Sequence, residues 1–194
     1  MESDRASVDE LVELAKDGRL SADEIDRVAQ RLMEEPPGVA TYKLLYVLSR
    51  SRAVRHEQVV ASFLDYANDP MVVRLALQTL CTFWGETARY LNDVCRFAAG
   101  VEWDYFGDVR QVALSAAGEY LRIQQNCELF RIVYDACINS SIGDVEERVA
   151  LEALARALGR PLADSLNKSR LEEWRSELHA EGLSWLKANC ESEK

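Results

Sequence analysis

The chain has 194 residues, of which 48% are hydrophobic and 29% are charged, with only 9 Gly and 4 Pro. This composition is typical of an ordered, helix-rich protein, because disordered chains carry fewer apolar residues and turn-rich β folds carry more Gly and Pro. No apolar run approaches the roughly 18 residues that span a bilayer, and the polar start MESDRASVDE lacks the basic and apolar regions of a signal peptide. We therefore predict a single domain that is cytoplasmic and has no membrane partner.

The net charge of −10 is concentrated near the N-terminus. Residues 1–35 carry 11 acidic and 5 basic side chains, whereas residues 36–159 carry 15 and 12, and residues 160–194 carry 7 and 6. An acidic field of this kind repels the phosphates of nucleic acids and attracts a basic protein. The alternative is an acidic face that serves only to keep the protein soluble. We expect a protein partner and no nucleic acid.

The cysteines and histidines show no metal or disulfide pattern. Five cysteines are an odd number, no two form a C-x-x-C pair, and the two histidines lie far apart without an H-E-x-x-H context. Cys81, Cys95 and Cys137 fall on apolar helical faces, where a reduced cysteine behaves as a small hydrophobic residue. We expect no metal, no cofactor and no disulfide framework.

Apolar residues recur at helical spacing along the whole chain, and no segment alternates convincingly as a strand would. Helix starts are marked by a Ser or Asp followed three residues later by Glu, which is the pattern of a capping box. This pattern begins at Ser7, Ser21, Asp144 and Ser169. Asp69-Pro70 marks another start, with Pro at the first helical position.

Helix ends are marked as well, by Gly18, by the run Pro36-Pro37-Gly38 and by Gly159. In chain order, the predicted helices cover residues 7–17, 21–35, 39–50, 56–67, 70–84, 88–99, 108–122, 127–138, 144–158 and 169–189. Because nearly every connection is a tight turn, we expect consecutive helices to be antiparallel neighbours.

A helix pair recurs along the chain at a period of 36–37 residues. The register is set by a small residue in the first helix of each pair, at Ala40, Ala76, Ala113 and Ala150. Equivalent positions of the four units form columns. Four residues after the small residue stand Leu44, Leu80, Ala117 and Leu154; seven after it stand Val47, Phe83, Tyr120 and Ala157; eight after it stand Leu48, Trp84, Leu121 and Leu158. Helix pairs of this kind cannot bury their apolar faces alone, so they must stack on their neighbours.

Three segments, DPMVVRLALQTL, GDVRQVALSAA and GDVEERVALEAL, resemble HEAT repeats, whose first helix opens with Asp, then Val and Arg, then a small residue. The Arg is Arg74, Arg110 or Arg148, and the first unit, PGVATYKLLYVL, has neither the Asp nor the Arg. The resemblance covers about residues 38–159. It implies an all-α fold, a right-handed α-solenoid of antiparallel helix pairs, in one domain over residues 1–194. Residues 1–37 and 160–194 would then form the N- and C-terminal capping helices.

In HEAT-like proteins the second helix of each pair lines the concave binding face. If Val59, Val94 and Ile132 point inward, the outward side chains on these helices are mixed acidic and aromatic. The partner-binding candidates among them are Asp65, Asp93, Phe97, Tyr134 and Asp135. Alternatively, a nearby loop or the C-terminal helix covers the aromatic ones.

The loop GVEWDYFGD is the second candidate surface, because it places Trp103, Tyr105 and Phe106 around Asp104. Trp and Tyr are common anchors at protein interfaces, and functional loops are carried on rigid scaffolds in this way. The alternative is that the aromatic loop folds back over its own helices. We therefore count Trp103, Asp104 and Tyr105 among the predicted partner-binding residues.

Signatures for phosphate cradling, dinucleotide binding and serine hydrolysis are absent from the sequence, so we expect a non-enzymatic protein. Small, acidic HEAT-like proteins resemble bacterial immunity proteins of toxin systems, which bind a toxin domain, often a basic nuclease, and block it. The resemblance implies an inhibitor that binds and occludes a basic toxin or effector protein.

Three alternatives stay open. The first is a HEAT-like scaffold or adaptor of another kind. The second is a HEAT-like DNA glycosylase in which Trp103, Asp104 and Tyr105 form an aromatic pocket with a carboxylate, although the acidic charge opposes duplex binding. The third is a repeat-type lyase or chaperone that handles a cofactor-bearing partner.

Overall fold

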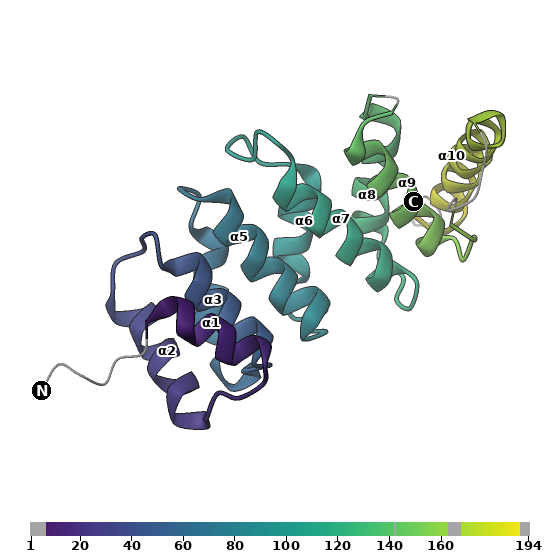
Figure 1. Cartoon of the computed structure of the whole chain (residues 1–194). Helices are drawn as coiled ribbons and strands as arrows, with labels where there is room; N and C mark the ends of the chain where they lie inside the picture. Colours follow the sequence, from purple (N-terminus) through teal and green to yellow (C-terminus); the bar gives the residue numbers. More distant parts are fainter. Residues whose placement is uncertain (1–6, 142, 163–167, 191–194) are drawn as a thin grey trace, which may run out of the picture. The chain divides into compact units, whose positions relative to one another are not determined.

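A computed structural model describes residues 7–141, 143–162 and 168–190, and within these residues every regular element is helical. The helices form two compact units, Met1–Glu86 and Thr87–Lys194 (Figure 1). The all-α prediction is confirmed, whereas the continuous solenoid and the single domain stay predictions. None of the described helices is both long enough and apolar enough to cross a membrane.

The first unit is organised around its third helix. Its elements are α1 (Val8–Lys16), α2 (Ala22–Glu34), α3 (Thr41–Arg50), η1 (Val54–His56), α4 (Glu57–Ala61), η2 (Ser62–Asp65), α5 (Pro70–Leu77) and the π-helical turn η3 (Gln78–Phe83). The helix α3 packs against α1, α2 and α5 (Figure 1). The core of this unit is mostly apolar and includes Val28, Leu45, Leu48, Val60 and Leu77.

Side-chain caps fix three helix starts of the first unit, as the sequence predicts. The hydroxyl of Ser7 accepts from the backbone N–H of Glu10 at 3.2 Å. At Ser21 the capping box is complete, because Ser21 accepts from the Glu24 N–H and the Glu24 carboxylate accepts from the Ser21 N–H. Asp69 caps α5 through the backbone N–H groups of its first turn. Each such cap stabilises a helix by about 1 kcal/mol.

The second unit contains α6 (Leu91–Ala99), α7 (Asp108–Leu121), α8 (Cys127–Asn139), α9 (Val145–Ala157) and α10 (Lys168–Cys190). The helix α7 packs against α6 and α9, and α8 packs against α6, α9 and α10 (Figure 1). The helices α7 and α9 approach each other closely at Gly118, where an added Cβ would lie 2.6 Å from the Cα of Ala153. Only glycine allows these two helices to come so close. The predicted cap at Ser169 lies outside the side chains that the structure describes.

The burial of the repeat columns supports the predicted register. Ala76, Ala113 and Ala150 are fully buried. Four residues on, Leu80, Ala117 and Leu154 are fully buried as well. In the first pair, Ala40 is only half-buried and Thr41 beside it is buried. The inward faces of the first helices are therefore those that the sequence indicates.

In the column seven residues after the small residue, the predicted burial is wrong for Phe83, which is 51% exposed, although Val47 in the same column is buried. The reason is the π-helical turn η3, in which the Trp84 N–H donates to the carbonyl of Thr79, five residues back, at 2.9 Å. One extra residue in a helical turn rotates the following side chains around the helix axis. Phe83 therefore leaves the core face, and Trp84 is only half-buried.

The expectation of no disulfide is wrong, because Cys127 and Cys190 are bonded to each other. These cysteines are the first residue of α8 and the last residue of α10. Phe130 and Trp185 stack between the same two helices, with ring centroids 3.9 Å apart. The helices thus run in opposite directions and bring together two cysteines separated by 63 positions, which sequence spacing does not reveal.

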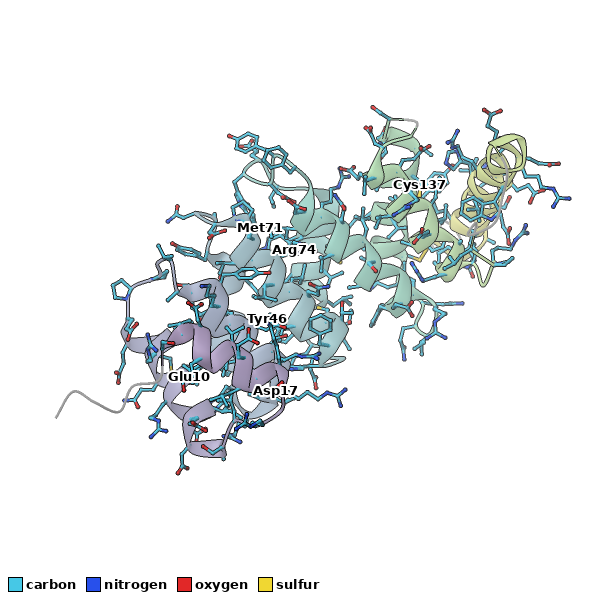
Figure 2. The ribbon with its side chains drawn as sticks, viewed as in Figure 1. Glu10, Asp17, Tyr46, Met71, Arg74 and Cys137 are labelled. Atoms are coloured by element: carbon cyan, nitrogen blue, oxygen red, sulfur yellow. A yellow bond between two sulfur atoms is a disulfide. The ribbon has the colours of Figure 1, made fainter. Side chains whose placement is uncertain are left out.

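The other three cysteines are not disulfide-bonded. Cys81 and Cys137 are buried and Cys95 is half-buried, which confirms the prediction that they pack as small apolar residues (Figure 2 shows Cys137 on α8). Burial raises the pKa of the Cys137 thiol far above its usual value, and the nearby Glu147 carboxylate adds to the effect. Such a thiol stays protonated and unreactive at neutral pH.

Candidate functional site

Residues 100–107 form the loop between α6 and α7, and Asp104 fixes its shape. The Oδ2 atom of Asp104 accepts hydrogen bonds from the backbone N–H groups of Val109 at 3.0 Å and Arg110 at 2.9 Å. The Asp104 N–H donates to the carbonyl of Val101, and the Gly107 N–H donates to the carbonyl of Asp104. The carboxylate therefore caps α7 from inside the loop and holds the loop in one conformation.

Trp103 turns back onto α6 and covers Phe97. Their ring centroids lie 6.0 Å apart in an edge-to-face arrangement, and the guanidinium of Arg96 lies 4.4 Å from the Phe97 centroid on that ring. Phe97 is only 1% exposed, so its predicted place on an open binding face is wrong. The physical reason is that the loop supplies an aromatic cover, the alternative that the sequence left open.

Tyr105 and Phe106, in contrast, lie in solvent and are 89% and 88% exposed. They follow directly after the anchored Asp104 and precede Gly107, whose positive φ of 68° favours glycine. Val145, at the start of α9, is a further exposed apolar residue in the second unit. Two aromatic side chains held in water by a fixed loop are unusual, because large exposed apolar groups commonly mark binding surfaces.

A cleft of about 330 Å³ lies beside these aromatic residues, between the loop and the start of α9. Two of its lining residues form an ion pair, Arg110 Nη1 with Glu146 Oε1 at 2.6 Å, and Arg110 Nε also donates to the carbonyl of Ala98 at 3.0 Å. Arg110 thus ties the ends of three helices together. Asp144 also lines the cleft, and it makes none of the capping bonds predicted for it.

The sequence-predicted residues come from several elements of both units. Asp65 lies in η2 of the first unit, whereas the others belong to the second unit. Asp93 is half-buried and pairs with Arg96 at 2.8 Å, and Asp135 is exposed on α8. The structure brings Trp103, Asp104 and Tyr105 together in the loop but does not join them to Asp135.

Tyr134 is covered by α10. An added Cβ at Gly182 would lie 2.8 Å from Cδ2 of Tyr134, and the ring of His179 lies 6.4 Å away in an edge-to-face arrangement. Burial raises the pKa of the Tyr134 hydroxyl, and the Asp135 carboxylate adds to the shift. The C-terminal helix therefore packs against the Tyr134 ring and leaves it half-buried.

A polar cluster that the sequence did not indicate lies beneath α10. Glu147 is buried, accepts from the backbone N–H of Gly143 at 2.6 Å, and pairs with Arg175 at 2.8 Å. The sequence assigned Glu147 to a capping box with Asp144, but the ion pair with α10 takes its carboxylate instead. His179 lies in the same region, where burial lowers its pKa and Arg175 lowers it further.

Among the described residues, no group of three His, Cys, Asp or Glu side chains could hold a metal ion. Asp104, which a glycosylase-like pocket would need, is bonded to the start of α7, and Trp103 packs on Phe97 rather than lining the cleft. No protein-family model, no curated protein and no solved structure matches this chain.

Proposed function

We propose that the protein is a non-enzymatic protein-binding module that docks a partner through Tyr105 and Phe106. The observation that carries this proposal is the near-complete exposure of two aromatic side chains on a loop that Asp104 holds in place. A fixed loop loses little conformational freedom when it binds, so more of the contact energy appears as affinity. Tyrosine is among the residues that most often dominate binding energy in interfaces.

The partner that fits best is a basic protein. The net charge of the chain is −10, and the cleft beside the aromatic pair is lined by Asp104, Asp144 and Glu146 against one guanidinium, that of Arg110. A field of this sign speeds the approach of a positively charged protein and repels nucleic acids. We infer an immunity-type inhibitor, which would act by binding and occluding a basic toxin or effector.

The experiment is site-specific photocrosslinking in the native cell. A photoreactive phenylalanine analogue replaces Phe106 in one variant and Ile123 in a matched control, because Ile123 is an exposed apolar residue of the same unit outside the loop. We expect one basic protein to be captured at position 106 and not at 123, and its capture to fall when Tyr105→Ala is added. Equal capture at both positions, or none at 106, would contradict the proposal.

A further inference from the structure

The C-terminal helix α10 packs on the second unit through one narrow apolar stripe (Figure 1). Four residues at helical spacing, Trp174, Leu178, Gly182 and Leu186, are buried along it. Most of the other described side chains of this 23-residue helix are exposed. Because the apolar contact is small for a helix of this length, other restraints contribute to keeping α10 docked on α8 and α9.

The first restraint is covalent and lies at the C-terminal end of α10. Cys190 is bonded to Cys127 at the start of α8, while the chain itself connects the other end of α10 to α9. With both ends attached, α10 cannot move far from the helices beneath it. Both cysteines are only half-buried, so a dithiol can reach the bond. Reduction yields two cysteine thiols, and the dithiol gives up two electrons and two protons and becomes a disulfide itself.

The second restraint is the protonation state of His179, near the middle of α10. Within the described part of the chain, the buried Nε2 atom of His179 has no hydrogen-bond partner, and neither has the buried indole N–H of Trp174. A protonated histidine ring carries an N–H donor on both nitrogens. Protonation would therefore leave a buried N–H unpaired, in a ring that packs edge-to-face on Tyr134.

The charges around His179 also oppose a second positive charge. Burial lowers the pKa of His179, and Arg175, one turn earlier on α10, lowers it further. From α9 the Glu147 carboxylate acts in the opposite sense, but it is already paired with Arg175 at 2.8 Å. From α8 the ring of Tyr134 faces His179, and burial keeps its phenol neutral by raising its pKa. Undocking lets the His179 ring take up a proton, so acid favours the undocked helix below the ordinary histidine pKa of about 6.5.

We propose that α10 is a releasable strap with two restraints, the disulfide and the unprotonated His179 ring, and that a dithiol reductant and mild acid together detach it from α8 and α9. The two restraints lie about 16 Å apart along the helix, so each can be removed without the other. Detachment uncovers Phe130 and Tyr134 on α8 and Glu147 on α9. The strap is independent of the aromatic loop, so either proposal can fail without the other.

The test is hydrogen exchange of the full chain at pH 7 and pH 5, before and after reduction with dithiothreitol, with mass spectrometry of peptides from α10 and α7. Each rate, divided by the intrinsic rate at the same pH, gives the opening equilibrium of that helix. We expect acid alone to raise α10 opening about tenfold, within the limit of about 25-fold that an ordinary histidine allows between these pH values. Reduction alone should raise it by about tenfold or more, because the C-terminal end is freed. Both together should multiply these factors, while α7 stays closed.

Three variants assign the effects to their residues. His179→Gln should remove the acid effect on α10 and keep the effect of reduction, whereas the matched control His56→Gln, at the other histidine of the chain, should behave as the wild type. Cys127→Ser/Cys190→Ser should reproduce the reduced protein at both pH values. An acid effect that persists in His179→Gln would point to Glu147 or another carboxylate and overturn the proposal. So would an unchanged α10 after reduction, or an α7 that opens as much as α10, which would show global unfolding.

Discussion

Reduction of the Cys127–Cys190 disulfide should loosen α10 without unfolding it. The bond ties the last residue of α10 to the first residue of α8. Trp174, Leu178 and Leu186 on α10 are buried, so this apolar interface should still hold the helix after reduction. We therefore expect the reduced protein to keep its helix content and to lose stability.

The size of this loss follows from the separation of the two cysteines. A cross-link over 63 positions removes loop-closure entropy from the unfolded chain, which the chain-entropy relation puts at roughly 4 kcal/mol at 25 °C. Structure that persists in the unfolded chain lowers this value, so about 2–4 kcal/mol is the expected range. With a typical urea slope, the unfolding midpoint should fall by about 1–2 M.

The assay is urea unfolding with and without dithiothreitol, followed by tryptophan fluorescence, since Trp174 and Trp185 both report on α10. The Cys127→Ser/Cys190→Ser variant should match the reduced wild type and should not respond to dithiothreitol. Alkylation of the denatured, unreduced protein should modify three cysteines, those that are free thiols. Modification of all five cysteines would refute the pairing itself, and an unchanged midpoint would refute the entropy argument.

Three further predictions concern the second unit. Glu147→Ala leaves the mostly buried Arg175 without its partner and should cost about 3–5 kcal/mol in chemical unfolding, whereas adding Arg175→Met should recover most of the loss. Gly118→Ala gains about 1 kcal/mol of helix propensity, yet the approach to Ala153 at 2.6 Å should make the net change destabilising, measured as a lower melting temperature. Because the pKa of His179 is lowered in the folded state, stability should fall as pH drops below its unfolded value of about 6.5, and His179→Gln should reduce that slope between pH 7 and pH 5.

The helices could be predicted from the sequence because their signals are local. A cap such as Ser21 with Glu24 acts over three residues, and a buried column such as Ala113 and Ala117 acts over one turn. Local signals fail at Phe83, which the repeat spacing places in the core but which is exposed. The π-helical turn that ends at Phe83 carries no cap or turn residue in the sequence to mark it, and it rotates Phe83 out of its predicted column.

The candidate surfaces could be predicted only in part because exposure depends on what folds over a helix. Spacing placed Phe97 and Tyr134 on outward faces, but Trp103 covers the first and α10 covers the second. Within the loop, composition indicated an aromatic surface but could not separate Trp103, which turns inward, from Tyr105, which stays in water. Which aromatic side chain turns inward depends on the backbone N–H groups that the Asp104 carboxylate binds. Those groups come into place only in the folded structure.

In the proposed complex, charge would mainly affect the rate of association and aromatic contact the rate of dissociation. Burying one exposed aromatic side chain removes about 150–250 Å² from water, which at about 25 cal/mol per Å² corresponds to about 4–6 kcal/mol before other terms oppose it. A surface ion pair contributes about 0–1 kcal/mol and is screened beyond about 8 Å at physiological salt. Tyr105 and Phe106 would therefore set how long a partner stays bound, while the net charge of −10 would set how quickly it arrives.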